Sequence, residues 1–210
     1  FADIDAYLHH RRGYARGSNK LATGALRSWL DYAPSRGWAP PGLAAGVWQP
    51  RIYSLAGLLP GPTPEQVRAT VKSLRGSQSV VLRDRALFLL LSTYGLRASE
   101  VCRLRLQDLD WVGSRLRIER SKAGRSGWLP LETTVGDAIA RYLQKARPRD
   151  VPGAVFLSIR APFRPISTSA LYNVVAHHLR AAVTVPRGHG PHGLRHASAR
   201  ALLGAGASLK

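Results

Sequence analysis

The sequence has one cysteine, no methionine and only 12 acidic residues among 210. A lone cysteine, Cys102, excludes an intramolecular disulfide and a cysteine-rich metal site, and it fits a reducing, cytoplasmic compartment. The longest strongly apolar run, residues 86–91, is far shorter than the roughly 20 residues that cross a bilayer. We therefore expect no membrane partner. No secretory signal opens the chain. Because the chain has no methionine, begins at Phe1 and stops at Lys210 in an apparently helical stretch, we expect it to be a piece of a longer protein.

Positive charge is abundant. The chain carries 31 lysines and arginines, a net charge of +19, and only five of these residues are lysine. Arginine donates two parallel hydrogen bonds to a phosphate, so an arginine-rich excess favours a polyanionic partner. A GC-rich genome would explain the ratio of arginine to lysine, but not the shortage of acidic residues. The composition therefore predicts a nucleic-acid-binding protein.

Helix breakers divide the chain near residue 58. Residues 1–58 have mostly helical apolar spacing, and prolines and glycines then crowd residues 49–64, as is typical of a linker. Residues 1–60 carry a net charge of +4, whereas residues 61–210 carry +15. We predict two domains, 1–58 and 59–210, with the second as the main polyanion-binding body.

The second part is predicted to be mainly helical with a small sheet. Thr63 is a good N-cap for a helix through Leu74, and Gly95 can end a buried helix over 82–93 in a left-handed cap. The other predicted helices are 98–105, one capped by Thr133 or Thr134 and running to Ala146, one from residues 167–169 to Ala182, and a last one from about His192. Between them, strand-like pieces separated by turn signals at 113–114 and 123–124 predict an antiparallel sheet of three strands. The expected fold class is α+β.

Three short motifs carry side chains suited to chemistry. The first is Thr-Tyr-Gly-Leu-Arg-Ala-Ser-Glu, residues 93–100. Arg97 follows the end of a buried helix, so it can be aimed at a ligand with little loss of entropy, and Glu100 can reach back to orient it. On its local features alone, the segment fits a plain helical hairpin with a solvated arginine better.

The second motif is Glu-Arg-Ser-Lys-Ala-Gly-Arg, residues 119–125. Lys122 would lie at the tip of a two-stranded ribbon, where it could reach into a groove and present a proton to a leaving oxygen. An ordinary solvated hairpin is the alternative.

The third motif is His-Gly-Leu-Arg-His, residues 192–196. His192 and Arg195 share one face at a helix N-terminus, which favours an anion. The His-x-x-Arg pattern also occurs at His9 and His177, within predicted helices, where solvated faces are expected. The motif alone therefore decides nothing.

The order of the three motifs is specific. Gly-Leu-Arg-x-Ser-Glu, a hairpin lysine 25 residues after the arginine, and His-x-x-Arg-His 70 residues after the lysine resemble the tyrosine recombinase family of phage integrases and Xer-type recombinases. The resemblance covers the whole chain and is sharpest over 82–131 and 186–210. It implies the family's catalytic domain over 59–210, preceded at 1–58 by the last helices of a core-binding domain that helps to clamp DNA.

The resemblance also implies roles for single residues. Arg97 and Arg195 would grip the scissile phosphate, Lys122 would protonate the leaving 5′-oxygen, and His192 would assist proton transfer at the nucleophile. The remaining two matching positions, Glu100 and His196, would support the site. Such chemistry needs no cofactor and no metal, and the expected partner is double-stranded DNA, bound by a tetramer of the full-length protein on two duplexes.

One part of the family pattern is missing. The family's nucleophilic tyrosine follows His-x-x-Arg, whereas all seven tyrosines of this chain precede Arg195. We expect these 210 residues to bind DNA without cutting it, as part of an enzyme that works through a 3′-phosphotyrosyl intermediate. A non-catalytic DNA-binding protein of the same fold is the alternative. A structural RNA-binding protein would explain the charge but not the ordered motifs.

Overall fold

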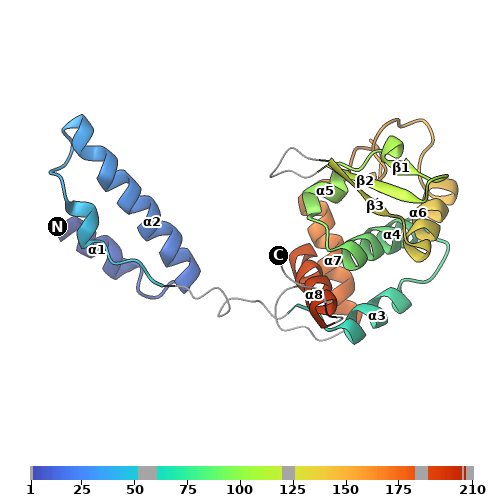
Figure 1. The fold of residues 1–210 in the computed structure, drawn as a ribbon, viewed down its shortest axis with the longest axis horizontal. Helices are drawn as coiled ribbons and strands as arrows, with labels where there is room; N and C mark the ends of the chain where they lie inside the picture. The colour runs from blue at the N-terminus through green and yellow to red at the C-terminus, as the bar shows by residue number, and fades with distance from the viewer. Residues whose placement is uncertain (1, 52–60, 120–125, 183–188, 205, 207–210) are drawn as a thin grey trace. The chain divides into compact units, whose positions relative to one another are not determined.

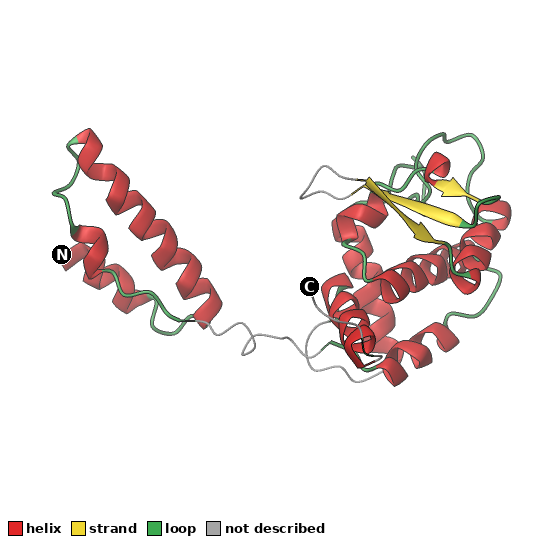
Figure 2. Cartoon of the chain, viewed as in Figure 1, coloured by secondary structure: helices red, strands yellow, loops and turns green. Residues whose placement is uncertain are grey.

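The computed structural model describes residues 2–51, 61–119, 126–182, 189–204 and 206. The chain divides into two compact units, Phe1–Leu58 and Leu59–Lys210 (Figure 1). Helices predominate in both units, and the strands of the described residues form a single small sheet (Figure 2). The predicted fold class is confirmed. None of the helices in the described ranges has the length and hydrophobicity needed to span a bilayer.

The first unit is built on two helices, α1 (Ala2–His10) and α2 (Arg16–Tyr32). Short 3-10 turns follow at Ala33–Arg36 and Leu43–Gly46. The apolar residues of α2 recur at helical spacing and bury one face against the second turn and α1. This small core contains Leu30, Ala44 and Val47, with Ile4, Leu8, Leu26 and Leu43 packed against it.

The second unit contains the remaining elements. The helices are α3 (Pro64–Ser73), α4 (Ser79–Tyr94), α5 (Ala98–Cys102), α6 (Thr133–Lys145), α7 (Thr168–Ala182) and α8 (Pro191–Gly204). The strands are β1 (Leu109–Asp110), β2 (Arg115–Glu119) and β3 (Ser126–Pro130), preceded by a 3-10 turn at Leu106–Asp108. In Figure 1, α4 crosses the middle of this unit between the sheet and α3. Residues 86–91 of α4 are buried around its whole circumference, which makes this helix the centre of the core.

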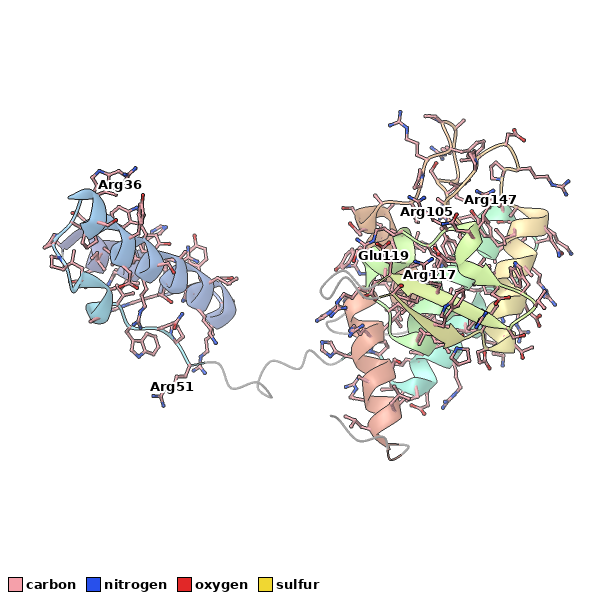
Figure 3. All side chains as sticks on the ribbon, turned by 45° about the horizontal axis from the view of Figure 1, so that its top comes forward. Arg36, Arg51, Arg105, Arg117, Glu119 and Arg147 are labelled. Atoms are coloured by element: carbon pink, nitrogen blue, oxygen red, sulfur yellow. The ribbon has the colours of Figure 1, made fainter. Side chains whose placement is uncertain are left out.

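The sheet is antiparallel in the order β1-β2-β3. Leu116 and Ile118 of β2 point into the core, and Arg117 and Glu119 project from the outward face (Figure 3). Arg117 pairs with Trp128 across β2 and β3. This alternation is the period of two expected of a half-buried strand.

A buried charged group joins α4 to α7. The Asp84 carboxylate accepts hydrogen bonds from the Arg83 guanidinium at 2.7 and 2.8 Å, and its other oxygen lies 2.8 Å from Nε2 of His178. Arg83 also donates to the backbone carbonyl of Leu157. Because each charge has partners, this buried cluster fixes how α7 and the segment before it lie on α4.

The helix boundaries confirm some sequence predictions and correct others. Thr63 caps α3 with a reciprocal pair of hydrogen bonds to Gln66, and Ser167 Oγ accepts from the Ala170 amide at the start of α7. α6 begins at Thr133 with Glu132 as its N-cap residue, so the prediction of a threonine cap was wrong. α5 ends at Cys102 instead of at residue 105, because the backbone of residues 104–106 pairs with residues 153–155 instead of continuing the helix.

Candidate functional site: an arginine and histidine pocket at the end of α4

The turn after α4 places Arg97. Gly95 ends the helix in the left-handed conformation, with φ of 59°, and its amide donates to the Leu91 carbonyl, as predicted. An added Cβ at this position would also lie 3.1 Å from Oγ of Ser198, which is closer than an ordinary van der Waals contact. The chain therefore reverses tightly against α8, and Arg97 becomes the residue before α5.

Glu100 accepts hydrogen bonds from both the backbone and the side chain of Arg97. One carboxylate oxygen accepts from the Arg97 amide at 2.8 Å, and the other accepts from the Arg97 guanidinium at 2.9 Å. The Glu100 side chain is 3% exposed, whereas that of Arg97 is 38% exposed. The carboxylate thus fixes the backbone amide of Arg97 and one edge of its guanidinium, and the rest of the guanidinium faces solvent. The predicted contact between Glu100 and Arg97 is present.

Arg195 reaches the same turn from α8. Its Nη1 donates to the Gly95 carbonyl at 2.5 Å, across 100 residues of sequence. One turn further along α8, Ser198 Oγ donates to the Thr93 carbonyl at 3.4 Å. These two contacts fasten α8 to the end of α4, and they bring the two arginines singled out by the sequence to one place.

The two histidines of the motif face each other. The His192 and His196 rings meet edge to face, with centroids 4.4 Å apart. Burial lowers the pKa of His196 below its ordinary value of 6.5, and the nearby His192, Arg200 and Arg195 lower it further. His196 is therefore neutral at pH 7, while His192 lies exposed at the first turn of α8.

Two adjoining cavities have Leu96, Arg97 and Arg195 in common. The first, of about 210 Å³, also contains His192, with Thr168 and Tyr172 of α7 on its wall. The second, of about 300 Å³, lies toward Glu100, Ile118 and Leu129. Three of the predicted site residues thus line one cavity, and Glu100 lines the neighbouring one.

The other two His-x-x-Arg pairs are placed differently. His9, Arg12, His177 and Arg180 are all exposed, as expected for solvated faces. His192 and Arg195 line a cavity together with Arg97, whereas His9 and Arg12 line a separate cavity of the first unit that contains no residue of the three motifs.

Lys122 lies outside the residues that the structure describes. The strand that follows it, β3, is tied to the site by Tyr94, whose hydroxyl donates to the Pro130 carbonyl and accepts from the Glu132 amide, each at 2.8 Å. Burial raises the pKa of Tyr94, so this hydroxyl stays protonated. The end of β3 is thereby fixed to the last turn of α4, two residues before Leu96.

The side chains of the cavity are suited to an anion. Guanidinium and imidazole groups donate hydrogen bonds, and the guanidinium groups carry positive charge. The only carboxylate lining the two cavities, Glu100, is already paired with Arg97. Within the described ranges, no group of three or more histidine, cysteine, aspartate or glutamate side chains is arranged to hold a metal ion.

Sequence reasoning missed the contribution of α7. Thr168 and Tyr172 line the cavity but belong to no motif. It also missed Arg200, which donates to the carbonyls of Gly61 and Pro62 and so joins α8 to the start of the second unit. For the contribution of Tyr172, the only signal in the sequence was Gly190 immediately before Pro191, a glycine at the entry to a helix.

Comparison with known proteins finds a matching family and relatives that cover most of the chain. Residues 63–210 match the model of the Phage integrase family. The Sinorhizobium fredii protein y4rA, named as an integrase/recombinase, is 40% identical over 191 residues, which cover 90% of this chain and 46% of that protein. The tyrosine recombinase XerD of Lacticaseibacillus casei is 34% identical, with 100% of this chain and 71% of that protein covered. The chain thus spans about half the length of y4rA.

Solved structures share the fold. A lambda integrase (75–356) dimer bound to a COC′ core site superposes with a TM-score of 0.74 at 17% identity, covering 96% of this chain and 72% of that chain. A lambda integrase tetramer bound to a Holliday junction gives a TM-score of 0.69 at 18% identity, with 96% and 59% covered. At these identities the likeness concerns the fold.

Proposed function

Because the chain belongs to the phage integrase family, we propose that it is the DNA-binding and phosphate-binding part of a site-specific recombinase that cuts and rejoins DNA by metal-free transesterification. The observation that carries the proposal is the meeting of Arg97 and Arg195 in one cavity with His192. These residues come from two motifs about 100 residues apart, and the fold unites them at the end of one helix.

Arg97 and Arg195 are proposed to hold the two non-bridging oxygens of the scissile phosphate. Each guanidinium is fixed at one edge, by Glu100 or by the Gly95 carbonyl, which leaves further N–H groups for a ligand. Phosphoryl transfer passes through a state with added charge on the equatorial oxygens. Two positioned cations stabilise that charge more than they stabilise the ground state.

Proton transfer is assigned to His192 and Lys122. A tyrosine oxygen forms a bond to phosphorus while the bond from phosphorus to the 5′-oxygen breaks, which leaves a 3′-phosphotyrosyl ester. His192 accepts the tyrosine proton, and Lys122 delivers a proton to the departing 5′-oxygen. Glu100 and His196 act through their neighbours as positioning residues.

The partner is proposed to be duplex DNA. Residues 61–210 carry 24 basic and 9 acidic residues, and the lambda integrase neighbours are themselves bound to a core site and to a Holliday junction, the latter as a tetramer. A full-length protein is therefore proposed to act as a tetramer on two duplexes. The 210 residues contain no tyrosine after Arg195, so this polypeptide alone is expected to bind DNA without a covalent link.

Duplex affinity in arginine variants tests the proposal. Arg97→Gln and Arg195→Gln should each weaken binding of a labelled duplex about tenfold at low salt, the usual scale for a lost charge-assisted hydrogen bond. The matched control is Arg68→Gln, because Arg68 is exposed and already paired with Glu65. Equal losses in all three variants would show that only total charge matters and would refute the phosphate site.

A further inference from the structure

The entry to α8 rests on the ring of Tyr172. Gly190 is buried, and a Cβ added to it would lie 2.6 Å from Cδ2 and 3.3 Å from Cζ of that ring. A Cβ atom essentially never lies less than 3.0 Å from a neighbouring atom, so either the ring or the turn would have to shift. The Gly190 backbone and the Tyr172 ring are therefore in contact over a surface that any side chain at position 190 would disrupt.

Gly190 also begins the helix that carries the site. Its carbonyl accepts from the amides of Gly193, at 2.9 Å, and Leu194, at 3.4 Å. These are the first hydrogen bonds of α8, so the position of Gly190 sets where the helix starts and how it is rotated. His192 and Arg195 lie two and five residues further on, and a small shift at Gly190 would move both.

Tyr172 is a firm support for this turn. It belongs to α7, whose neighbouring residues Leu171 and Val175 are fully buried in the core. The same helix is held to α4 through His178 and Asp84. Tyr172 itself is 48% exposed and lines the cavity of Arg97, His192 and Arg195. The half-exposed ring of Tyr172, on a helix that is packed in the core, thus contacts the backbone segment that leads to His192 and Arg195.

We propose that Tyr172 is a positioning residue, whose ring holds Gly190 and thereby sets His192 and Arg195 at the spacing and orientation that a phosphate requires. The effect on phosphate binding rests on the proposed function, whereas the contact between Tyr172 and Gly190 does not depend on it. A substrate-binding role for the hydroxyl group would be different, and it predicts a loss when only that oxygen is removed.

Two substitutions and their combination test the contact. Gly190→Ala should weaken binding of inorganic phosphate about tenfold, because the added methyl group displaces the turn and misplaces charge-assisted donors. In a Tyr172→Ala background the same change should cost less than about twofold, since the ring is no longer there to collide with. Gly204→Ala is the matched control at the other end of α8, where an added Cβ meets nothing within 4 Å.

The hydroxyl group is tested separately. Tyr172→Phe keeps the ring and should leave phosphate binding unchanged, whereas Tyr172→Leu removes the flat support and should weaken it. If Gly190→Ala does not fold, this pair decides. Equal effects of Gly190→Ala in both backgrounds, or a loss in Tyr172→Phe as large as in Tyr172→Leu, would overturn the proposal.

Histidine NMR signals separate this inference from the proposed function. The His192 and His196 rings lie close enough for each to shift the signals of the other, so their resonances in phosphate-free protein report the geometry of the first turns of α8. If Gly190→Ala and Tyr172→Leu shift these resonances but the unchanged protein ignores phosphate, the positioning contact stands and the phosphate site fails. If phosphate binds but neither substitution moves the resonances, the positioning role fails.

Discussion

Arg147 and the pair Arg97 and Arg195 are the same side chain used in two ways. The Arg147 guanidinium is buried at the end of α6 and donates to the carbonyls of Pro148, Val151, Ala154 and Val155 (Figure 3). Each of its nitrogens therefore has an acceptor. Among the described residues, the guanidinium groups of Arg97 and Arg195 have one hydrogen-bond partner each, Glu100 and the Gly95 carbonyl.

The number of internal acceptors distinguishes these roles. A guanidinium with a backbone carbonyl at each nitrogen holds a loop in place and has few donors left for a ligand. A guanidinium fixed at one edge and open at the other is oriented but still able to bind, which suits a cation that must receive a ligand. Charge alone could not make this distinction, because all three residues are arginines in a strongly basic chain.

The largest effect is expected on stability, at Arg147. Arg147→Leu would leave four carbonyls without their donor and should destabilise the protein by about 3–5 kcal/mol, which lowers the thermal midpoint by roughly 10 °C. Thermal unfolding measures this loss. The control is Arg149→Leu, two residues away and exposed, which should change the midpoint by no more than about a degree. Equal losses in both would show that the carbonyl contacts contribute little.

Lys122 should affect the chemical step more than binding. In a form of the protein that cleaves DNA, Lys122→Ala should slow cleavage by about 10²-fold, the usual scale for a positioned general acid. Replacing the 5′-bridging oxygen with sulfur should remove most of this defect, because a thiolate leaves without a proton. A variant that stays equally slow on the sulfur substrate would exclude Lys122 as the acid and leave His192 as the next candidate.

The salt dependence of duplex binding should distinguish Arg97 and Arg195, which have donors left for a ligand, from the buried Arg147. If about six phosphates are contacted, log K for duplex binding should fall with log salt at a slope near −5. A slope shallower than about −2 would contradict binding along the phosphate backbone of a duplex. The combined variant Arg97→Gln and Arg195→Gln should flatten the slope by about one to two. Arg147→Leu, measured where it remains folded, should leave the slope unchanged.

The smallest effect is a pH dependence from His196. Its pKa is lowered in the folded protein, mainly by burial, so the unfolded chain binds more protons between the two pKa values. Stability should therefore fall as the pH drops through 6.5, and His196→Gln should reduce that fall. Thermal midpoints across about pH 5 to 8 measure it. The exposed His177→Gln is the control, and an unchanged pH profile in His196→Gln would contradict the assignment.

Local signals in the sequence predicted local structure well. Gly95 as a left-handed cap, Thr63 as an N-cap and a strand after the turn at 113–114 each depend on neighbours within a few residues, and the structure contains all three. The motif order also identified Arg97, His192 and Arg195 before any contact between them was visible. Local sequence can still point to the wrong N-cap residue. In α6 the N-cap is Glu132, one residue before the threonines that were expected.

Contacts between distant segments could not be predicted in the same way. The hydrogen bond from Arg195 to Gly95 spans 100 residues, and the contact of Tyr172 with Gly190 depends on how α7 lies in the core. The first leaves no pattern in the local sequence, and the second leaves only a glycine at the entry to a helix. Arg147 illustrates the same limit, since its row of carbonyl partners forms only when residues 148–155 fold back over the end of α6.

The central claim is that Arg97 and Arg195 bind one phosphate together. A titration with inorganic phosphate, followed by NMR in the unchanged protein, in Arg97→Gln, in Arg195→Gln and in the double variant, tests it most directly. If both arginines hold the same anion, each single substitution should remove most of the phosphate-dependent shift at His192, and the double variant should lose little more. Independent, additive losses, or a shift at His192 that survives both substitutions, would contradict a shared phosphate site.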